Sequence, residues 1–176
     1  MSEHVRPDRP APASAKRVFV SLGSNLGDRL SCLRAAREAL GALGGVALLA
    51  ASGVYETDPQ DYEEQPAFLN QVVCLETTLR PLDLLHACQA IEAAQGRVRG
   101  TRFGPRTLDI DILFYEGVQS DDPELILPHP RALRRAFVMV PLADLWSLAR
   151  GMPAVDVAVR AAELAGEQTV ENYSEA

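Results

Sequence analysis

The chain has 176 residues, of which 47% are hydrophobic, and a formal net charge of −7. This length suits one domain with a buried core, and the composition is that of a soluble globular protein. The negative charge argues against general nucleic-acid binding, which needs a broad basic surface, and no apolar run approaches the roughly 18 residues of a membrane span.

Three regions differ in composition. Residues 1–16 are rich in Pro, Ala and charge and lack the apolar core of a secretory signal, so we predict a disordered leader and a cytoplasmic protein. Residues 17–150 are expected to form a single domain, followed by an acidic, loosely ordered tail at 151–176. The three cysteines include no CxxC pair and are expected to be reduced, packed thiols.

The first half of the domain predicts a strand, a helix and two further strands. Asp28 can cap the helix, because its carboxylate can accept from the free N–H groups of the first turn. Apolar residues then recur at helical spacing. The predicted elements are a strand at 17–22, a helix from 28 to about 43, a strand at 46–55 with a bulge at Gly53, and a strand at 68–78.

The second half predicts a helix, a long loop and a strand. Pro81 suits the first turn of a helix, where its missing N–H needs no partner, and Gly96 is expected to end that helix. Residues 97–107 contain two glycines, one proline and four arginines and predict a loop, followed by a strand at 108–115. Beyond it we expect a short strand at 125–127 and helical structure at 136–149.

The resulting order, βαββαβ, indicates an α+β protein of the ferredoxin-like type. In that arrangement an antiparallel sheet packs two helices on one face. No internal repeat or second domain is expected.

The strand at 108–114, with sequence LDIDILF, carries the strongest chemical signal. Because side chains alternate between faces, Asp109 and Asp111 should point one way, and Leu108, Ile110, Ile112 and Phe114 toward the core. Two carboxylates on one face repel, and a divalent cation would remove that cost; Mg²⁺ commonly takes one or two carboxylates together with substrate phosphates. The plainer interpretation is an amphipathic strand with a solvated acidic face.

The loop before this strand favours the metal. Arg97, Arg99, Arg102 and Arg106 lie within ten residues that contain no acid. Guanidinium groups bind phosphate oxygens bidentately, and the glycines allow the loop to approach a ligand closely. An arginine loop joined to paired aspartates predicts magnesium-dependent phosphate transfer from ATP, with a solvated surface loop as the alternative.

Other candidates are weaker. The segment GSNLGD lacks the spacing and the lysine of a P-loop and is interpreted as a turn and helix cap. Gln89 and Glu92 share a helix face that ends near the arginine loop. His129 lies between two prolines and is a candidate phosphate contact, followed by a basic cluster at Arg131, Arg134 and Arg135.

The run 102–113, RFGPRTLDIDIL, resembles the signature of the 6-hydroxymethyl-7,8-dihydropterin pyrophosphokinase family. GSNLGDR after the first strand, FLN at 68–70, QGRVR at 95–99 and PHP at 128–130 are similar to that family in the same order. The resemblance covers about residues 17 to 148. Where members often carry Tyr and Trp, this chain has Phe68 and Phe103, which keep an aromatic ring without a hydrogen-bonding group.

The resemblance implies a ferredoxin-like enzyme of folate biosynthesis that moves the terminal diphosphate of ATP onto the hydroxymethyl group of the pterin and leaves AMP. It implies two Mg²⁺ ions held by Asp109 and Asp111, with Arg97 and Arg106 as catalytic phosphate contacts. The implied ATP-binding residues are Gln89, Glu92, Arg99, Arg102, Ile112, His129 and Arg135. The implied pterin-binding residues are Thr57, Asp58, Phe68, Asn70 and Phe137.

Two alternatives come from other classes. An RNA-binding module can use the same βαββαβ layout, but the negative charge and the absence of stacking aromatics on the central strands argue against it. A regulatory domain without catalysis would leave the paired aspartates beside the arginines without a purpose. We expect an enzyme that acts as a monomer, without nucleic-acid or membrane partners.

Overall fold

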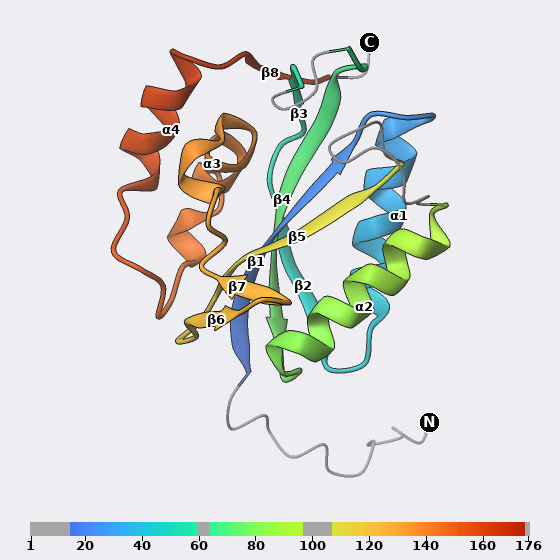
Figure 1. The fold of residues 1–176 in the computed structure, drawn as a ribbon, viewed down its shortest axis with the longest axis vertical. Coiled ribbons are helices and arrows are strands. Elements are labelled where there is room, and N and C mark those ends of the chain that lie inside the picture. Colours follow the sequence, from blue (N-terminus) through green and yellow to red (C-terminus); the bar gives the residue numbers. More distant parts are fainter. Residues whose placement is uncertain (1–14, 60–63, 97–106, 175–176) are drawn as a thin grey trace, which may run out of the picture.

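A six-stranded antiparallel sheet forms the centre of the protein (Figure 1). The computed structural model describes residues 15–59, 64–96 and 107–174. The strand order is β5–β1–β4–β3–β8, and β2 pairs with the other end of β4. The strands of this sheet are β1 (Lys16–Ser24), β2 (Val46–Ala51), β3 (Tyr55–Thr57), β4 (Phe68–Thr77), β5 (Asp109–Tyr115) and β8 (Val170–Asn172).

Helices cover both faces of this sheet (Figure 1), so the expectation of helices on one face only is wrong. A separate hairpin joins β6 (Ser120–Asp122) to β7 (Leu125–Leu127). The α-helices are α1 (Arg29–Ala42), α2 (Pro81–Ala94), α3 (Ala136–Ala143) and α4 (Val157–Ala165), with 3-10 turns at η1 (Ala132–Arg134) and η2 (Trp146–Leu148). In the described ranges, none of these helices is long and apolar enough to cross a membrane.

The helix starts follow local chemistry as predicted. The Asp28 carboxylate accepts from Ser31 N–H at 3.1 Å and caps α1. Pro81 occupies the first turn of α2, and Gly96 follows that helix with a φ of 82°, which a residue with a side chain rarely adopts. The strand expected at 46–55 is interrupted at residues 52–54, around the predicted bulge position, and forms β2 and β3.

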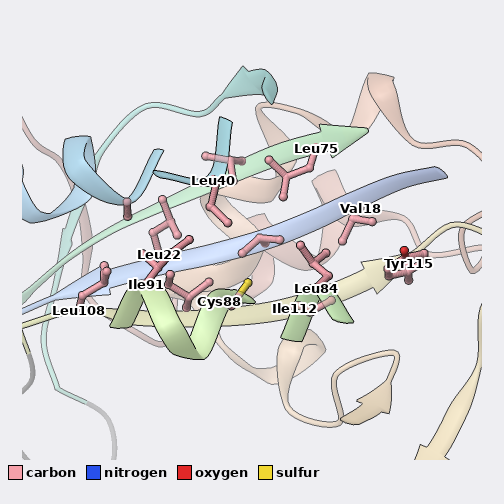
Figure 2. Close-up of a cluster of buried hydrophobic side chains, with 14 of the residues drawn as sticks. Val18, Leu22, Leu40, Leu75, Leu84, Cys88, Ile91, Leu108, Ile112 and Tyr115 are labelled. Carbon is pink, nitrogen blue, oxygen red and sulfur yellow. The ribbon is translucent and has the colours of Figure 1, made fainter. Parts of the chain in front are cut away.

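The first core lies between the sheet and α1 and α2 (Figure 2). Helical spacing aligns Leu33, Ala36 and Leu40 on α1, and Leu84, Cys88 and Ile91 on α2. Their partners are Val18, Val20 and Leu22 of β1, Ile110 and Ile112 of β5, and Leu108 just before β5. Burial raises the pKa of the Cys88 thiol to about 12, which fits the prediction of a packed, unreactive cysteine.

The second core lies on the opposite face, between the sheet and α3 and α4. Phe19 and Val72 from the sheet pack there with Met139 and Leu142 of α3 and with Leu164 of α4. Strand β1 is therefore buried on both faces, which is why its sequence is a continuous apolar run and not an alternating one.

A β-bulge in β5 interrupts the alternation of its side chains between the two cores. Val20 pairs with Ile112, but Phe19 pairs with Phe114, so Leu113 is an extra residue. The alternation is reset there, and Phe114 lies in the second core, not on the face of Ile110 and Ile112 as the sequence predicts. The bulge thus places two successive residues, Leu113 and Phe114, in the second core, and Tyr115 returns to the first core.

The segment after residue 151 is ordered structure, where the sequence predicts a loose tail. Asp156 caps α4 by accepting from Val159 N–H at 3.1 Å, and Val157, Ala161 and Leu164 of α4 are buried. Strand β8 then pairs antiparallel with β3. These elements depend on contacts with distant parts of the chain, which local sequence patterns do not reveal.

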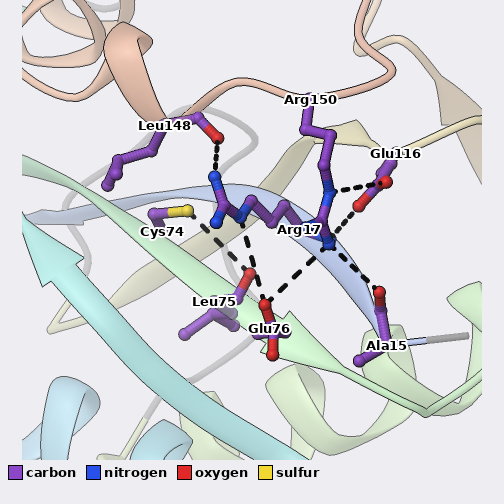
Figure 3. Close-up of polar contacts among 8 residues, drawn as sticks. All are labelled: Ala15, Arg17, Cys74, Leu75, Glu76, Glu116, Leu148 and Arg150. Carbon is purple, nitrogen blue, oxygen red and sulfur yellow. Dashed lines mark hydrogen bonds and ion pairs between the residues drawn. The ribbon is translucent and has the colours of Figure 1, made fainter. Parts of the chain in front are cut away.

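Charged side chains connect the segment before α4 to the start of β1 (Figure 3). Arg17 donates through Nη1 to the Leu148 carbonyl at 2.7 Å and through its backbone N–H to Glu116 Oε2 at 2.7 Å. Arg150 pairs with Glu116 at 2.9 Å. Burial alone would raise the pKa of Glu116, but hydrogen bonds from Arg150 and from the Arg17 N–H together lower it.

Glu116→Gln is expected to destabilise the fold by about 1 kcal/mol, which lowers Tm by about 2–4 °C, because it removes the ion pair and weakens the acceptor for Arg17. The folded pKa of Glu116 lies below the unfolded value, so the carboxylate contributes fully above that value and its contribution disappears as the pH falls through the folded pKa. The Tm difference measured by thermal denaturation should therefore be widest well above the unfolded pKa of about 4.3 and should shrink as the pH falls below it.

Glu163→Gln is the matched control, because its ion pair with Arg160 is exposed and within one helix. It should change Tm by less than about 1 °C. A Glu116→Gln protein whose Tm matches the wild type at pH 7 would show that this cluster does not stabilise the fold.

Candidate active site

Gly23, near the end of β1, is the point where the predicted metal and pterin residues meet. It pairs with Asn70 of β4 on one side and Asp109 of β5 on the other. A Cβ atom at position 23 would lie 3.1 Å from Asn70 Oδ1, 3.7 Å from Phe68 Cδ1 and 4.0 Å from Asp109 Cβ. The missing side chain therefore lets these three groups converge on one surface of the sheet.

Asp109 and Asp111 lie on the same face of β5, as predicted, and both are partly exposed. Asp111 pairs with Ser21 and Asp109 with Gly23, so only small residues lie beside them on β1. Their face is the one opposite Ile110 and Ile112 of the first core, on the α3 side of the sheet.

The donor set at these aspartates fits magnesium bound together with a phosphate substrate. Within residues 15–59, 64–96 and 107–174, no group of three or more Asp, Glu, His or Cys side chains could hold a metal ion. Mg²⁺ does not need such a cage, because it usually binds one or two carboxylates, several waters and substrate phosphates. Asp109 and Asp111 are the described residues that would hold it.

Glu92 on α2 has a role that the sequence does not reveal. Its side chain is only 5% exposed, and Oε2 accepts from Ile110 N–H at 3.1 Å. This bond joins α2 to β5 at the residue between the two aspartates. Glu92 thus fixes the strand that carries Asp109 and Asp111, whereas Gln89, one turn earlier, is exposed to solvent.

The predicted pterin residues of β3 and β4 form one polar group. Asn70 Nδ2 donates to Thr57 Oγ1 at 2.6 Å, and both side chains are at most 3% exposed. Thr57 also pairs with Phe68 across the two strands, and Phe68 is partly buried beside them. Asp58 follows on the exposed surface. Since Nδ2 is engaged by Thr57, the Asn70 Oδ1 atom that faces Gly23 is the one placed toward the sheet surface.

The loop after β1 fastens the chain that leads into Phe68. Asn25 is 2% exposed and donates to Gln65 Oε1 at 2.9 Å and to the Pro66 carbonyl at 3.0 Å. Arg29 donates to the Ala67 carbonyl at 3.0 Å. The sequence predicts that the GSNLGD segment is a turn and a helix cap. In the structure it also holds the chain before β4 through the hydrogen bonds of Asn25.

His129 follows β7 and lies against β5. Its N–H donates to the carbonyl of the bulged residue Leu113 at 2.9 Å, and its Nδ1 accepts from Arg131 N–H at 3.2 Å. Burial, then the charges of Arg135 and Arg131, lowers the pKa of His129 to about 4. His129 is therefore neutral near pH 7, and because Nδ1 accepts, its proton is on Nε2, which can donate to an anionic oxygen.

Arg135 and Phe137 contact each other at the start of α3. The Arg135 Cζ atom lies 5.2 Å from the centroid of the Phe137 ring, a cation–π distance. One of these residues was predicted for ATP and the other for the pterin, so the structure places a candidate from each set side by side.

The remaining predicted residues divide into two kinds. Ile112 is 2% exposed and belongs to the first core, so its side chain packs inside the protein. Arg97, Arg99, Arg102 and Arg106 lie outside the described residues.

Gly23 and Ser21 were not predicted as site residues. The signal for Gly23 was a glycine inside an apolar strand, since such a glycine often marks a close approach of another group.

Comparisons with known proteins agree on one family. The family model of 7,8-dihydro-6-hydroxymethylpterin-pyrophosphokinase (HPPK) matches residues 19–147. Proteins called 2-amino-4-hydroxy-6-hydroxymethyldihydropteridine pyrophosphokinase are similar: the one from Methylorubrum extorquens is 48% identical over 73% of this chain and 82% of its own length. The one from Pseudomonas aeruginosa is 50% identical over 74% of this chain and 80% of its own length.

Solved structures show the same fold. A wild-type HPPK-DHPS structure from Plasmodium falciparum with pterin and p-hydroxybenzoate superposes with a TM-score of 0.65 at 15% identity. The alignment covers 88% of this chain but 44% of that one, so this chain spans less than half of the two-part protein. The family model and the bacterial relatives show that the chain belongs to the 7,8-dihydro-6-hydroxymethylpterin-pyrophosphokinase family.

Proposed function

We propose that this protein transfers the terminal diphosphate of ATP to 6-hydroxymethyl-7,8-dihydropterin in folate biosynthesis. The observation that carries the proposal is the convergence of Asp109, Phe68 and Asn70 around Gly23 in a chain of this family. The finer fold assignment, ferredoxin-like, is supported by the strand order β5–β1–β4 with β2 and β3 both paired to β4.

The pterin is assigned to the surface beside Gly23. Asn70 Oδ1 can accept a hydrogen bond from the pterin ring, and the Thr57 hydroxyl holds Asn70 in that orientation. Phe68 and Phe137 offer aromatic faces for stacking on a flat heterocycle. Asp58, which is exposed and directly follows β3, is a further candidate contact.

ATP is assigned to the side of β5 and α3. The neutral His129 can donate through Nε2, and Arg135 supplies a permanent positive charge for phosphate oxygens. We assign Gln89, Arg99 and Arg102 to the same nucleotide. Glu92 and the buried Ile112 would contribute to nucleotide binding by fixing the position of β5. Arg97 and Arg106 would contact the transferred diphosphate.

In the proposed reaction, the hydroxymethyl oxygen of the pterin bonds to the β-phosphorus of ATP while the bond from that phosphorus to the α,β-bridging oxygen breaks. AMP leaves with the bridging oxygen, and the hydroxyl proton passes to solvent. Two Mg²⁺ ions, when bound, would neutralise the phosphate charge in this step. Asp109 and Asp111 would hold these ions, and the chain's other groups orient the two substrates for an in-line attack.

The direct test is incubation of the protein with ATP, Mg²⁺ and 6-hydroxymethyl-7,8-dihydropterin, followed by separation of the nucleotides. We expect AMP and the pterin diphosphate in equal amounts. ADP as the product would indicate transfer of one phosphoryl group, and the absence of both nucleotides would refute the proposal. Action as a cytoplasmic monomer and the division of the chain at residues 16 and 17 stay predictions. Helix α4 and strand β8 of the predicted tail pack against the domain, as described above.

Asp109→Asn and Asp111→Asn are each expected to lower kcat by more than about 100-fold, because even the outer partners of a metal site are worth roughly 10–100-fold. The Asn side chain has nearly the same volume as Asp, but its neutral amide cannot supply the negative charge that magnesium needs. Circular dichroism should show an unchanged fold. Asp121→Asn is the control, an exposed aspartate on β6, and should retain wild-type activity; near-normal rates in both site variants would refute the metal assignment.

Gly23→Ala tests the convergence itself. The new Cβ would lie 3.1 Å from Asn70 Oδ1, so Asn70 must shift, and kcat/KM for the pterin should fall by about five- to 20-fold. Tm should not fall much, since alanine suits a strand better than glycine by roughly 0.5–1 kcal/mol. Gly44→Ala is the control, because a Cβ added there would have no other atom within 4 Å. Equal pterin kinetics in the two variants would contradict the placement.

A further inference from the structure

The segment from Gly166 to Tyr173 contacts two sides of the proposed site, although the family model ends at residue 147. We propose that this segment positions the nucleotide-binding residue Arg135, with Gln168 as the positioning residue and β8 as its anchor. The inference rests on the proposed function for the role of Arg135, and on the hydrogen bonds of Gln168 for the mechanism.

The Gln168 side chain forms hydrogen bonds with the backbone on both sides of Arg135. Its Oε1 accepts from Ala136 N–H at 2.9 Å, and its Nε2 donates to the Arg134 carbonyl at 3.0 Å. These two groups belong to the peptide bonds that precede and follow Arg135. One carboxamide therefore holds both peptide planes and restricts the direction in which the Arg135 side chain leaves the chain.

The start of α3 needs such a partner. Its N-cap position is Arg135, whose side chain makes no capping hydrogen bond. The first N–H groups of a helix have no acceptor within the helix, and a cap usually comes from a neighbouring Ser, Thr, Asp or Asn. Gln168, 32 residues further along the chain from Ala136, supplies the acceptor instead.

Gln168 is itself held at two ends. Its N–H donates to the Leu164 carbonyl at 2.8 Å, which ties it to the end of α4. Two residues later, Val170 pairs with Thr57 as β8 joins the edge of β3, and Tyr173 N–H donates to the Val54 carbonyl at 2.9 Å. The backbone that carries the Gln168 carboxamide is therefore held between the end of α4 and strand β8.

The same anchor connects to the pterin side of the proposed site. Arg29 forms an ion pair with Glu56 of β3 at 2.8 Å and lies 5.8 Å from the centroid of the Tyr173 ring. Thr57, paired with β8, accepts from Asn70. A short segment thus spans from the Arg135 backbone to the strand that carries Thr57. The same segment therefore contacts both the proposed ATP side and the proposed pterin side of the site.

Gln168→Met removes both hydrogen bonds at similar length. We expect the Kd for a non-hydrolysable ATP analogue and the KM for ATP each to rise about five- to tenfold, with a smaller change in the KM for the pterin, because a displaced binding group costs affinity for its own ligand. Gln168→Glu keeps an acceptor for Ala136 N–H and should restore part of the ATP affinity. It also provides the second variant if Gln168→Met folds poorly.

Arg160→Met is the matched control. It removes a hydrogen bond of 2.7 Å from α4 to the Leu133 carbonyl, two residues before Arg135, and leaves the peptide groups around Arg135 untouched. We expect a Tm decrease similar to that of Gln168→Met with ATP affinity within about twofold of the wild type. Equal ATP affinity in Gln168→Met and the wild type, or equal losses in Gln168→Met and Arg160→Met, would overturn the inference.

Amide hydrogen exchange separates this inference from the proposed function. In Gln168→Met the Ala136 N–H should exchange faster than in the wild type, in the absence of any substrate. If the wild-type protein formed no AMP, the proposed function would fail, and analogue binding together with Ala136 exchange would decide the inference alone. Unchanged exchange at Ala136 would overturn it whatever the activity.

Discussion

The placement of the proposed site depends on the pairing of β1 with two strands at once. All nine residues of β1 pair with β4, and six of them pair with β5. Since a shift of one residue in either pairing would send every side chain to the opposite face, two registers together decide that Asn70 and Asp109 flank Gly23. The burial of β1 on both faces specifies these registers strongly, because any slip would bring polar residues into one of the two cores.

The bulge at Leu113 joins this sheet geometry to the nucleotide side of the site. Before the bulge, Ile110 and Ile112 face the first core, so Asp109 and Asp111 are left on the other face. At the bulge the ladder with β1 is broken, and the Leu113 carbonyl accepts from His129 N–H instead. The irregularity therefore serves two purposes. It places Phe114 in the second core directly after Leu113, and it holds the turn that carries His129 against the strand of the aspartates.

Local patterns predicted the elements whose side chains repeat regularly. The apolar run of β1, the stripes of α1 and α2 and the alternation of Asp109 and Asp111 can be derived from periodicity, because each reflects one packing surface. Three features could not be derived in this way. The bulge at Leu113 changes the alternation without any glycine to mark it. Strand β8 has three residues and depends on β3 as a partner, and the buried Glu92 accepts from Ile110 N–H of a distant strand.

Much of the polar chemistry of the described site is satisfied within the protein. Asn70 is oriented by Thr57, His129 by Arg131 N–H, and the strand between the aspartates by Glu92. Groups held in this way lose little conformational freedom when a ligand arrives, so more of the interaction energy remains for binding and orientation. At the carboxylates of β5 the proposed metal would add a further interaction, because two like charges on one face of a strand repel and a cation between them would relieve that repulsion. The fixed hydrogen bonds thus hold the groups of the proposed substrate sites in position before a ligand arrives.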